Sequence, residues 1–268
     1  MKRLARGEFF GQTNHTIHLD GLTLTDTVYT HDRVDWHYHE QAYFTFILEG
    51  AVIEGNKNET YECQPGSLLF HNWQEAHYNI KPPGFTRGFH LEIERGWFRD
   101  LGLEEPEQGS VRLDDPSMKL GMYRMAAEAR NFTVHSGVSI QTLLVDLLSQ
   151  MQGGSGLRLY KNPSWVGQLK QILHDAPDET HSLAMLSGIL RIHPVHLSRD
   201  FPKYFHCTLG EYLRKLKIAR AMVLLADKDC SLTTIAFDCG FADQSHFIRC
   251  FRQLNGMTPS GYRRLLFS

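Results

Sequence analysis

Two histidines near the start of the chain have a spacing that suggests metal chemistry. His37 and His39 lie in the stretch DWHYHEQAYFTFILEG (35–50) and lead into an apolar run that ends at a glycine. Side chains two positions apart point to the same face of a β-strand, so two imidazoles on one strand can form half of a metal site. The pair alone does not show whether such a site would belong to an enzyme.

A second set of residues, in the last third of the chain, has the chemistry of nucleic-acid recognition. Amide, hydroxyl, imidazole and guanidinium groups form hydrogen bonds with base edges and phosphates. Two stretches place such side chains on the predicted outer face of a helix: Val195, His196, Ser198 and Arg199 in the first, Gln244, Ser245, His246 and Arg249 in the second.

These two stretches are copies of one unit. Residues 196–215 align with residues 246–265 at a constant offset of 50, and upstream of them the offset is 49. The chain therefore contains a duplicated unit, with one residue inserted in the turn of the second copy. Two copies are too few for a solenoid.

Each copy is predicted to form a short helix, a tight turn and a second helix. In the second copy Ser231 and Asp243 are suited to cap the two helices, and Gly240 fits a turn that needs a left-handed residue. A long amphipathic helix, TLGEYLRKLKIARAMVLLAD (208–227), is predicted between the copies. This arrangement would place two helices in successive major grooves of DNA, about 34 Å apart.

The histidines require a different scaffold. From about residue 17 to residue 98, alternating runs such as AYFTFILEG (42–50) are separated by turn signals such as KPPG (81–84), which is typical of an all-β sandwich or barrel. Two helices are predicted between about 115 and 152. The apolar stripe of the second helix either packs on the same barrel or forms a dimer. GGSG and KNPS then indicate a linker.

Composition and charge agree with this division. The chain has 268 residues, of which 42% are hydrophobic, enough for two packed domains. Residues 1–163 contain 15 Lys and Arg against 21 Asp and Glu, whereas residues 164–268 contain 13 against 9. The C-terminal part is therefore the part expected to meet a polyanion.

The sequence also argues against several classes of protein. No apolar run approaches the roughly 18–20 residues of a membrane span, and the N-terminus lacks the apolar stretch of a secretory signal. The five cysteines are scattered and form no C-x-x-C pattern, so neither a disulfide framework nor a zinc finger is indicated. We expect a soluble, cytoplasmic protein.

The C-terminal part resembles the AraC family of transcription regulators. The resemblance is carried by SLTTIAFDCGFADQSHFIRCFRQLNGMTPSGYRR and HPVHLSRDFPKYFHCTLGEYLRKLKIARAMVLL, and it covers about 105 residues. It implies an α+β chain with a cupin-like β-barrel and flanking helices (1–152) for effector binding and dimerisation. A linker (153–163) and an all-α DNA-binding domain with two helix-turn-helix units (164–268) would follow. By position, Val195, Ser198, Arg199, Gln244, Ser245 and Arg249 would contact bases or backbone.

The first copy departs from the family pattern at three positions. Arg191 stands where the turn usually has glycine, and Ser187 where alanine is usual. Pro202 lies inside the first recognition helix and cannot donate a hydrogen bond to the Ser198 carbonyl, so it is predicted to kink or shorten that helix. The contacts of the second unit are therefore predicted more firmly.

Two N-terminal stretches resemble the motifs of cupin domains. His37 and His39, followed by Tyr43 and Gly50, are similar to the first motif, except that Tyr43 stands where metal-binding cupins commonly have Glu. QPGSLLFHNWQEAHY (64–78) resembles the second motif, with His77 at the usual histidine position.

The cupin resemblance implies a binding site at the barrel mouth. His37, His39 and His77 would present three imidazoles there, enough to hold Zn²⁺, Ni²⁺, Cu²⁺ or Fe²⁺. The other interpretation is a pocket of neutral histidines that binds an organic effector. The candidates for it are His37, His39, Tyr43, His77 and Trp36, with His71 and His90 as additions.

The leading hypothesis is a ligand-responsive transcription regulator with no catalytic residues and no certain cofactor. Its expected partners are double-stranded DNA with direct-repeat sites, a small-molecule effector, RNA polymerase and a second copy of the chain, without a membrane. The alternative is a metal-dependent cupin-type enzyme fused to a DNA-binding domain. A third reading is a constitutive DNA-binding protein whose barrel only dimerises. The sequence does not identify the effector, or distinguish activation from repression.

Overall fold

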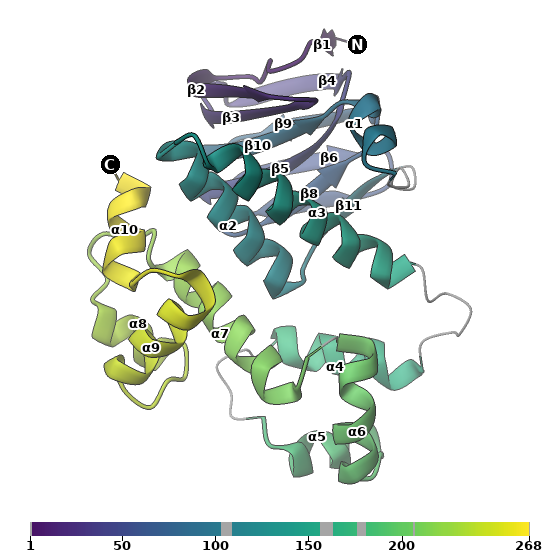
Figure 1. Cartoon of the computed structure of the whole chain (residues 1–268), viewed down its shortest axis with the longest axis vertical. Helices are drawn as coiled ribbons and strands as arrows, with labels where there is room; N and C mark the ends of the chain where they lie inside the picture. Colours follow the sequence, from purple (N-terminus) through teal and green to yellow (C-terminus); the bar gives the residue numbers. More distant parts are fainter. Residues whose placement is uncertain (1, 103–108, 156–162, 176–180, 206, 268) are drawn as a thin grey trace. The chain divides into compact units, whose positions relative to one another are not determined.

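The computed structural model describes residues 2–102, 109–155, 163–175, 181–205 and 207–267 (Figure 1). These residues form two compact units, residues 1–147 and residues 148–268. The division falls within a helix, five residues before the predicted end of the first domain.

The first unit contains two β-sheets. The five-stranded sheet has the order β1 (Lys2–Leu4), β4 (Arg33–His39), β9 (His77–Ile80), β6 (Val52–Asn56) and β7 (Thr60–Cys63). The six-stranded sheet has the order β11 (Ser110–Arg112), β8 (Leu68–His71), β5 (Ala42–Glu49), β10 (Arg87–Ile93), β3 (Leu22–Val28) and β2 (Gln12–Leu19).

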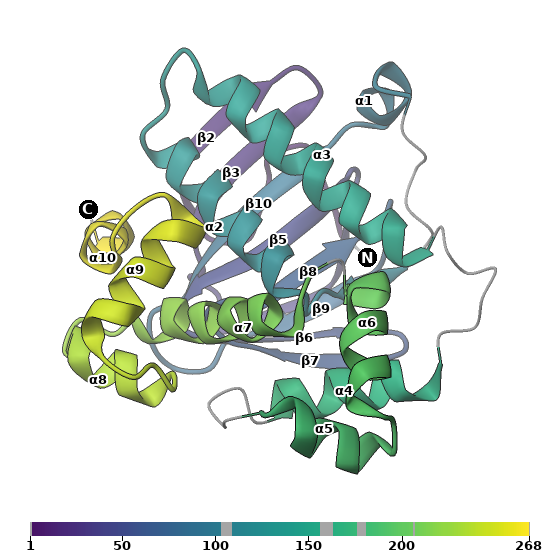
Figure 2. The same cartoon turned by 60° about the horizontal axis from the view of Figure 1, so that its bottom comes forward.

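Two helices cover one face of the six-stranded sheet, α2 (Pro116–Arg130) and α3 (Ser136–Ser155), as Figure 2 shows. A short helix, α1 (Arg95–Asp100), follows β10. Asp115 caps α2 by accepting a hydrogen bond from the Ser117 amide at 2.7 Å. From the predicted apolar stripe, Ile140, Leu144 and Leu147 are buried within the chain, which favours the packing interpretation of α3.

Strand β5 shows how the sheet positions the histidine site. Seven of its eight residues are buried, because the strand is covered on both faces. Phe46 contacts Tyr123 of α2, with ring centroids 4.5 Å apart. Tyr43 and Thr45 alternate with Phe44 and Phe46 and therefore face the space between the sheets.

The predicted closed barrel is not found. Among the described residues no hydrogen-bonded strand pair joins the two sheets, which end at β1 and β7 and at β11 and β2. The architecture is a two-layered α+β unit of two sheets with flanking helices. Alternating apolar residues are common to sandwiches and barrels, so the sequence pattern did not separate the two.

The second unit is helical throughout its described residues. Its elements are α4 (Ser164–Asp175), α5 (Leu183–Leu190), α6 (Pro194–Phe205), α7 (Leu209–Leu224), α8 (Leu232–Asp238), α9 (Gln244–Asn255) and α10 (Pro259–Phe267). α5 and α6 form the first helix-turn-helix, and α8 and α9 form the second. The core of the first packs Leu169, Leu186, Leu197 and Phe201 with Tyr212 of α7.

The predicted linker (153–163) overlaps the end of helix α3, which continues through Gly153 and Gly154 to Ser155 despite the low helix propensity of glycine. Predicted linker residues 156–162 lie outside the described residues. No helix in the described ranges is long and apolar enough to cross a membrane.

Candidate ligand cavity and DNA-binding surfaces

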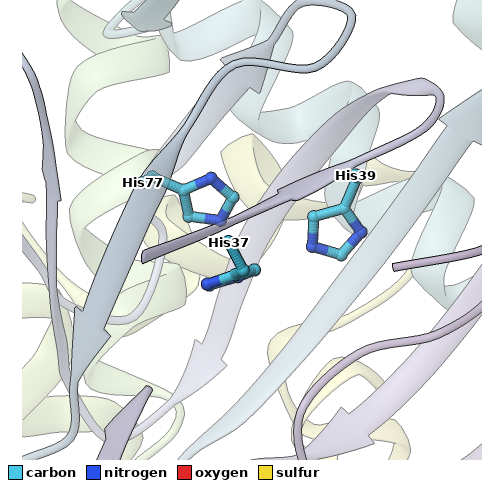
Figure 3. Close-up of side chains that lie close together, drawn as sticks. All are labelled: His37, His39 and His77. Carbon is cyan, nitrogen blue, oxygen red and sulfur yellow. The ribbon is translucent and has the colours of Figure 1, made fainter. Parts of the chain in front are cut away.

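The structure brings together the three histidines that the cupin resemblance singled out. Figure 3 shows the side chains of His37, His39 and His77 lying close together, and the rings of His37 and His77 are 4.2 Å apart between centroids. Because β4 pairs with β9, with His37 opposite His77, these side chains share one face of the sheet. All three are buried, and their potential ligand nitrogens lie within 4.8 Å of one another.

Hydrogen bonds fix how two of these rings are presented. His37 Nδ1 lies 2.9 Å from the Asp35 carbonyl and His77 Nδ1 lies 3.1 Å from the Glu75 carbonyl. A carbonyl only accepts, so Nδ1 donates in both rings and Nε2 carries the lone pair that a metal or ligand would use. The Tyr43 hydroxyl lies 3.0 Å from His77 Nε2 and donates to it.

Two buried carboxyl groups also face this interior. Glu54 Oε1 of β6 lies 3.2 Å from His71 Nε2, and Glu92 Oε1 of β10 lies 3.9 Å from His39 Nδ1. None of these four atoms has a hydrogen bond within the described part of the chain. Sequence reasoning missed both carboxyls, because AVIEG and FHLEIE carry no motif and the contacts depend on strand pairing.

Burial keeps the histidines and Glu54 of this cluster neutral near pH 7. It lowers the pKa of His37, lowers that of His39 and His71 well below its usual value, and brings those of His77 and His90 to about 3. Burial also raises the pKa of Glu54 to about 8 and that of Glu92 to about 7. Desolvation opposes the charged form in each case, so the imidazoles keep their lone pairs.

The segment before β2 covers the cavity. Phe9 stacks on His90 at 3.8 Å between ring centroids, and it also contacts His39 at 4.6 Å. Phe10 packs edge-on against His37 at 4.9 Å. The remaining cavity has a volume of about 30 Å³, far below the roughly 300–1,000 Å³ of typical organic-ligand pockets. The FF pair carried no sequence signal for this role.

Tyr43 lines the cavity, but Trp36 does not. Trp36 lies on the opposite face of β4 from the histidines, is 42% exposed and packs against Tyr78 at 5.1 Å. Trp36 therefore does not share the cavity with the histidines, because adjacent residues of a strand face opposite sides. The additional candidates His71 and His90 do lie in the cluster, where His71 stacks on Tyr43 at 4.4 Å.

The residues present fit a divalent metal in chemistry, but the cluster would have to contract. Three neutral imidazoles are suitable ligands for Zn²⁺, Ni²⁺, Cu²⁺ or Fe²⁺. Zinc–nitrogen bonds of about 2.0–2.1 Å imply nitrogen separations of about 3.3 Å in a tetrahedron. The Tyr43 hydroxyl would also have to release His77 Nε2, so Tyr43 competes with a metal for this atom.

The second helix-turn-helix has the predicted geometry. Ser231 accepts from the Thr234 amide at 3.0 Å, and Asp243 accepts from the His246 amide at 2.7 Å. Gly240 has φ 71°. One face of α9 is buried through Phe247 and Phe251. None of the four predicted DNA-contacting residues Gln244, Ser245, His246 and Arg249 is buried.

The first helix-turn-helix presents its candidates differently. Val195, His196, Ser198 and Arg199 are all exposed on α6. The Arg199 guanidinium, however, lies 3.1 Å from the Asp200 carboxylate, which also binds Lys203 at 2.8 Å. These two cations lower the pKa of Asp200 to about 2. By contrast, Arg249 forms no ion pair with any described residue, and Cys250 takes the place of Asp200.

Comparison with known proteins identifies this architecture. Residues 186–265 match a family model described as a helix-turn-helix domain. The transcriptional activator RhaS of Pectobacterium atrosepticum is 23% identical over 250 residues, which cover 87% of this chain and 88% of that protein. PqrA of Proteus vulgaris, a probable transcription factor, is 41% identical over 68 residues, covering 25% of this chain and 56% of that protein.

Among solved structures, ToxT of Vibrio cholerae aligns with a TM-score of 0.39 at 15% identity, over 91% of this chain and 99% of that one.

With two helix-turn-helix units and relatives named as transcription regulators, the chain is a DNA-binding transcription regulator and not an enzyme. The match covers the duplicated helix-turn-helix domain, in agreement with the resemblance of this part of the chain to AraC-family regulators.

Proposed function

We propose that the two-sheet unit of this regulator binds a small molecule or a metal ion and thereby controls DNA binding or transcription activation. The carrying observation is the buried group of five neutral histidines in a chain whose other unit binds DNA. A ligand with different affinity for DNA-competent and incompetent arrangements would shift their populations. The protein would act in the cytoplasm as a homodimer on direct-repeat sites and would contact RNA polymerase. The cupin-like character of the sheet unit belongs to this proposal.

The proposed DNA contacts are made by both recognition helices. Gln244, Ser245, His246 and Arg249 of α9 would enter one major groove, and Val195, His196, Ser198 and Arg199 of α6 the next. Support comes from the matching arrangement of the two units, each with one buried and one unburied helix face.

Arginine substitutions test these contacts. Arg249→Ala is expected to weaken binding to a duplex selected from a random pool by about 10- to 100-fold, as for a lost base contact. Arg199→Ala should cost less, because Asp200 already neutralises Arg199. Affinity would be measured against salt concentration. If neither substitution weakens binding, the recognition-helix assignment is wrong.

Metal binding is one form of the sensing proposal, through His37, His39 and His77. It is supported by the three converging nitrogens and by the small cavity. Metal content of the purified chain, and titration with Zn²⁺, Ni²⁺, Cu²⁺ and Fe²⁺, test it. We expect one metal per chain and loss of that metal in a His37→Ala, His77→Ala variant. An equal metal content in the variant would reject the site.

An organic effector is the second form of the proposal. The cavity is lined by Tyr43, Thr45 and Phe9 in addition to the histidines, so hydrogen-bonding and stacking groups are available. A ligand larger than a few atoms would have to displace Phe9. Mass spectrometry of the denatured protein after gentle purification would detect a retained molecule, and Phe9→Ala should raise its exchange rate.

A further inference from the structure

The turn between α5 and α6 has a backbone conformation that is unfavourable for its residue. Arg191 has φ 54° and ψ 41°, in the left-handed region. Apart from Gln74 it is the single described residue other than glycine with positive φ. The matching position in the second helix-turn-helix is Gly240, at φ 71°. Glycine adopts this region freely, whereas an arginine Cβ makes it unfavourable.

The two turns are otherwise built alike. In the first, the Arg191 amide donates to the Gly188 carbonyl at 3.4 Å and the Ile192 amide to the Ser187 carbonyl at 3.0 Å. In the second, the equivalent amides of residues 240 and 241 donate to the carbonyls of residues 237 and 236 at 2.8 and 2.9 Å. The turn thus keeps the shape that suits glycine although it contains arginine.

No side-chain contact of Arg191 with a described residue offsets the energetic cost of this backbone conformation. The Arg191 side chain is exposed, and its guanidinium makes no ion pair or hydrogen bond with any residue that the structure describes. The turn requires this backbone conformation but not an arginine, so an arginine at a position that suits glycine points to a functional contact of its side chain.

The position of Arg191 indicates which contact. It precedes Pro194, the first residue of α6, by three positions, and the N-terminal end of a recognition helix is the end that approaches base edges between two phosphate backbones. The cations of α6 itself, Arg199 and Lys203, are both bound by Asp200. Among the described residues, the first helix-turn-helix therefore has an unpaired cation at its turn, Arg191, and no unpaired arginine or lysine on α6.

We propose that Arg191 binds a DNA backbone phosphate beside the groove that α6 enters. The contact anchors the first helix-turn-helix at a position where the second has only Gly240. It is a positioning contact that carries no base specificity, and it rests on the proposed role of α6 in DNA binding.

The test is Arg191→Gly in the full-length protein, with Arg191→Lys as the conservative variant. We expect Arg191→Gly to melt at or above the wild-type temperature, because the backbone conformation becomes favourable. Its affinity for a duplex selected from a random pool should fall about eightfold at 0.1 M salt, and the slope of log K against log salt should fall by about 0.9, as for one lost phosphate contact. Random-sequence duplex should show the same loss. Arg191→Lys should keep the slope.

Lys57→Gly is the matched control, since it removes one exposed cation from a turn of the two-sheet unit. It should change neither the affinity for DNA nor its salt dependence. Wild-type affinity and slope in Arg191→Gly would overturn the proposal. So would a loss confined to one DNA sequence, which indicates a base contact, or a lower melting temperature, which indicates a structural role. Failure of the wild-type protein to select any duplex would overturn the proposed DNA-binding role as well.

Discussion

At the scale of single residues, the interior of the two-sheet unit is unusual in its neutrality. Five imidazoles with lowered pKa lie with two carboxyl groups of raised pKa, so near pH 6.5 most of the cluster is neutral and avoids the large cost of burying charge. His37, His39 and His77 were predictable from their motifs. Glu54 and Glu92 were not, because they reach the site through strands whose pairing no local pattern specifies.

The first prediction concerns stability against pH. The histidines have folded pKa values below their unfolded value near 6.5, so the unfolded state binds more protons between about pH 3 and 6.5, and stability rises with pH there. Glu54 and Glu92 have folded pKa values of about 8 and 7, above 4.5, so their contribution falls as pH rises through those values. Below pH 6.5 the five histidines outnumber the two carboxyls. Stability should therefore peak near pH 6.5 and fall toward pH 8.

Glu54→Gln is the control for this prediction. It should remove up to about 2 kcal/mol of the decline between about pH 6.5 and 8, since one pKa unit corresponds to about 1.4 kcal/mol. Urea unfolding of the full-length chain, followed by near-ultraviolet circular dichroism, measures both proteins. A wild-type profile that stays flat over this interval would contradict the assignment of a buried, protonated Glu54.

At the scale of elements, helix caps and turns were predicted correctly from local sequence, whereas effects of tertiary packing were not. In the second helix-turn-helix, Ser231 caps α8 and Asp243 caps α9, and Gly240 forms the left-handed turn, all as predicted. Such caps and turns depend on residues close in sequence. Pro202 was predicted to kink or shorten α6, and the shortening is not found. α6 has 12 residues, as α9 has, and Phe201 and Phe205 stack at 4.0 Å across the position of the proline. Packing therefore holds the last turn together.

The second prediction exchanges proline between the two recognition helices. Residue 252 of α9 matches residue 202 of α6 at the offset of 50. Arg252→Pro should destabilise the second helix-turn-helix by about 3 kcal/mol, because the proline removes a backbone hydrogen bond of α9 and clashes with the preceding turn. Pro202→Ala restores the missing backbone hydrogen bond of α6. The unfolded chain also gains entropy, which opposes this effect, so the first helix-turn-helix should be stabilised by a smaller amount. Thermal unfolding measures both, and equal effects of the two changes would refute the packing explanation.

The third prediction concerns the turn after β5. Gly50 has φ 72°, and a Cβ there would lie 2.0 Å from the Phe85 carbonyl oxygen. Gly50→Ala should therefore cost more than 2 kcal/mol, combining backbone strain with a steric clash against main chain. Gly84→Ala provides the control, because its Cβ would meet no atom within 4 Å although its φ is 121°. If both variants lose equal stability in urea unfolding, the clash with Phe85 makes no contribution.

At the scale of the whole molecule, the distribution of charge along the sequence agrees with the division of the structure into two units. The surplus of acidic residues up to residue 163 and of basic residues after it matches a division into a two-sheet unit and a helical unit that carries the DNA-binding domain. The duplicated unit was visible as a constant sequence offset. A cupin-like barrel was predicted, but no closed barrel is found among the described strands. Whether a sheet closes depends on pairing between strands far apart in the sequence, which local patterns do not specify.

The last prediction concerns the DNA that both helix-turn-helix units bind together. α7 has 16 residues, a rod about 24 Å long, and it packs against α6, α8 and α9, so the two recognition helices are held in one relative orientation. Inserting about 5 base pairs between the two half-sites of a selected duplex moves them to opposite faces of the DNA. Affinity should then fall to that of a duplex with one half-site. An insertion of about 10 base pairs restores the face but not the distance, and should give no recovery. Arg249→Ala serves as the reference for loss of one unit. Binding that tolerates either insertion would show that α7 does not hold the two units rigidly.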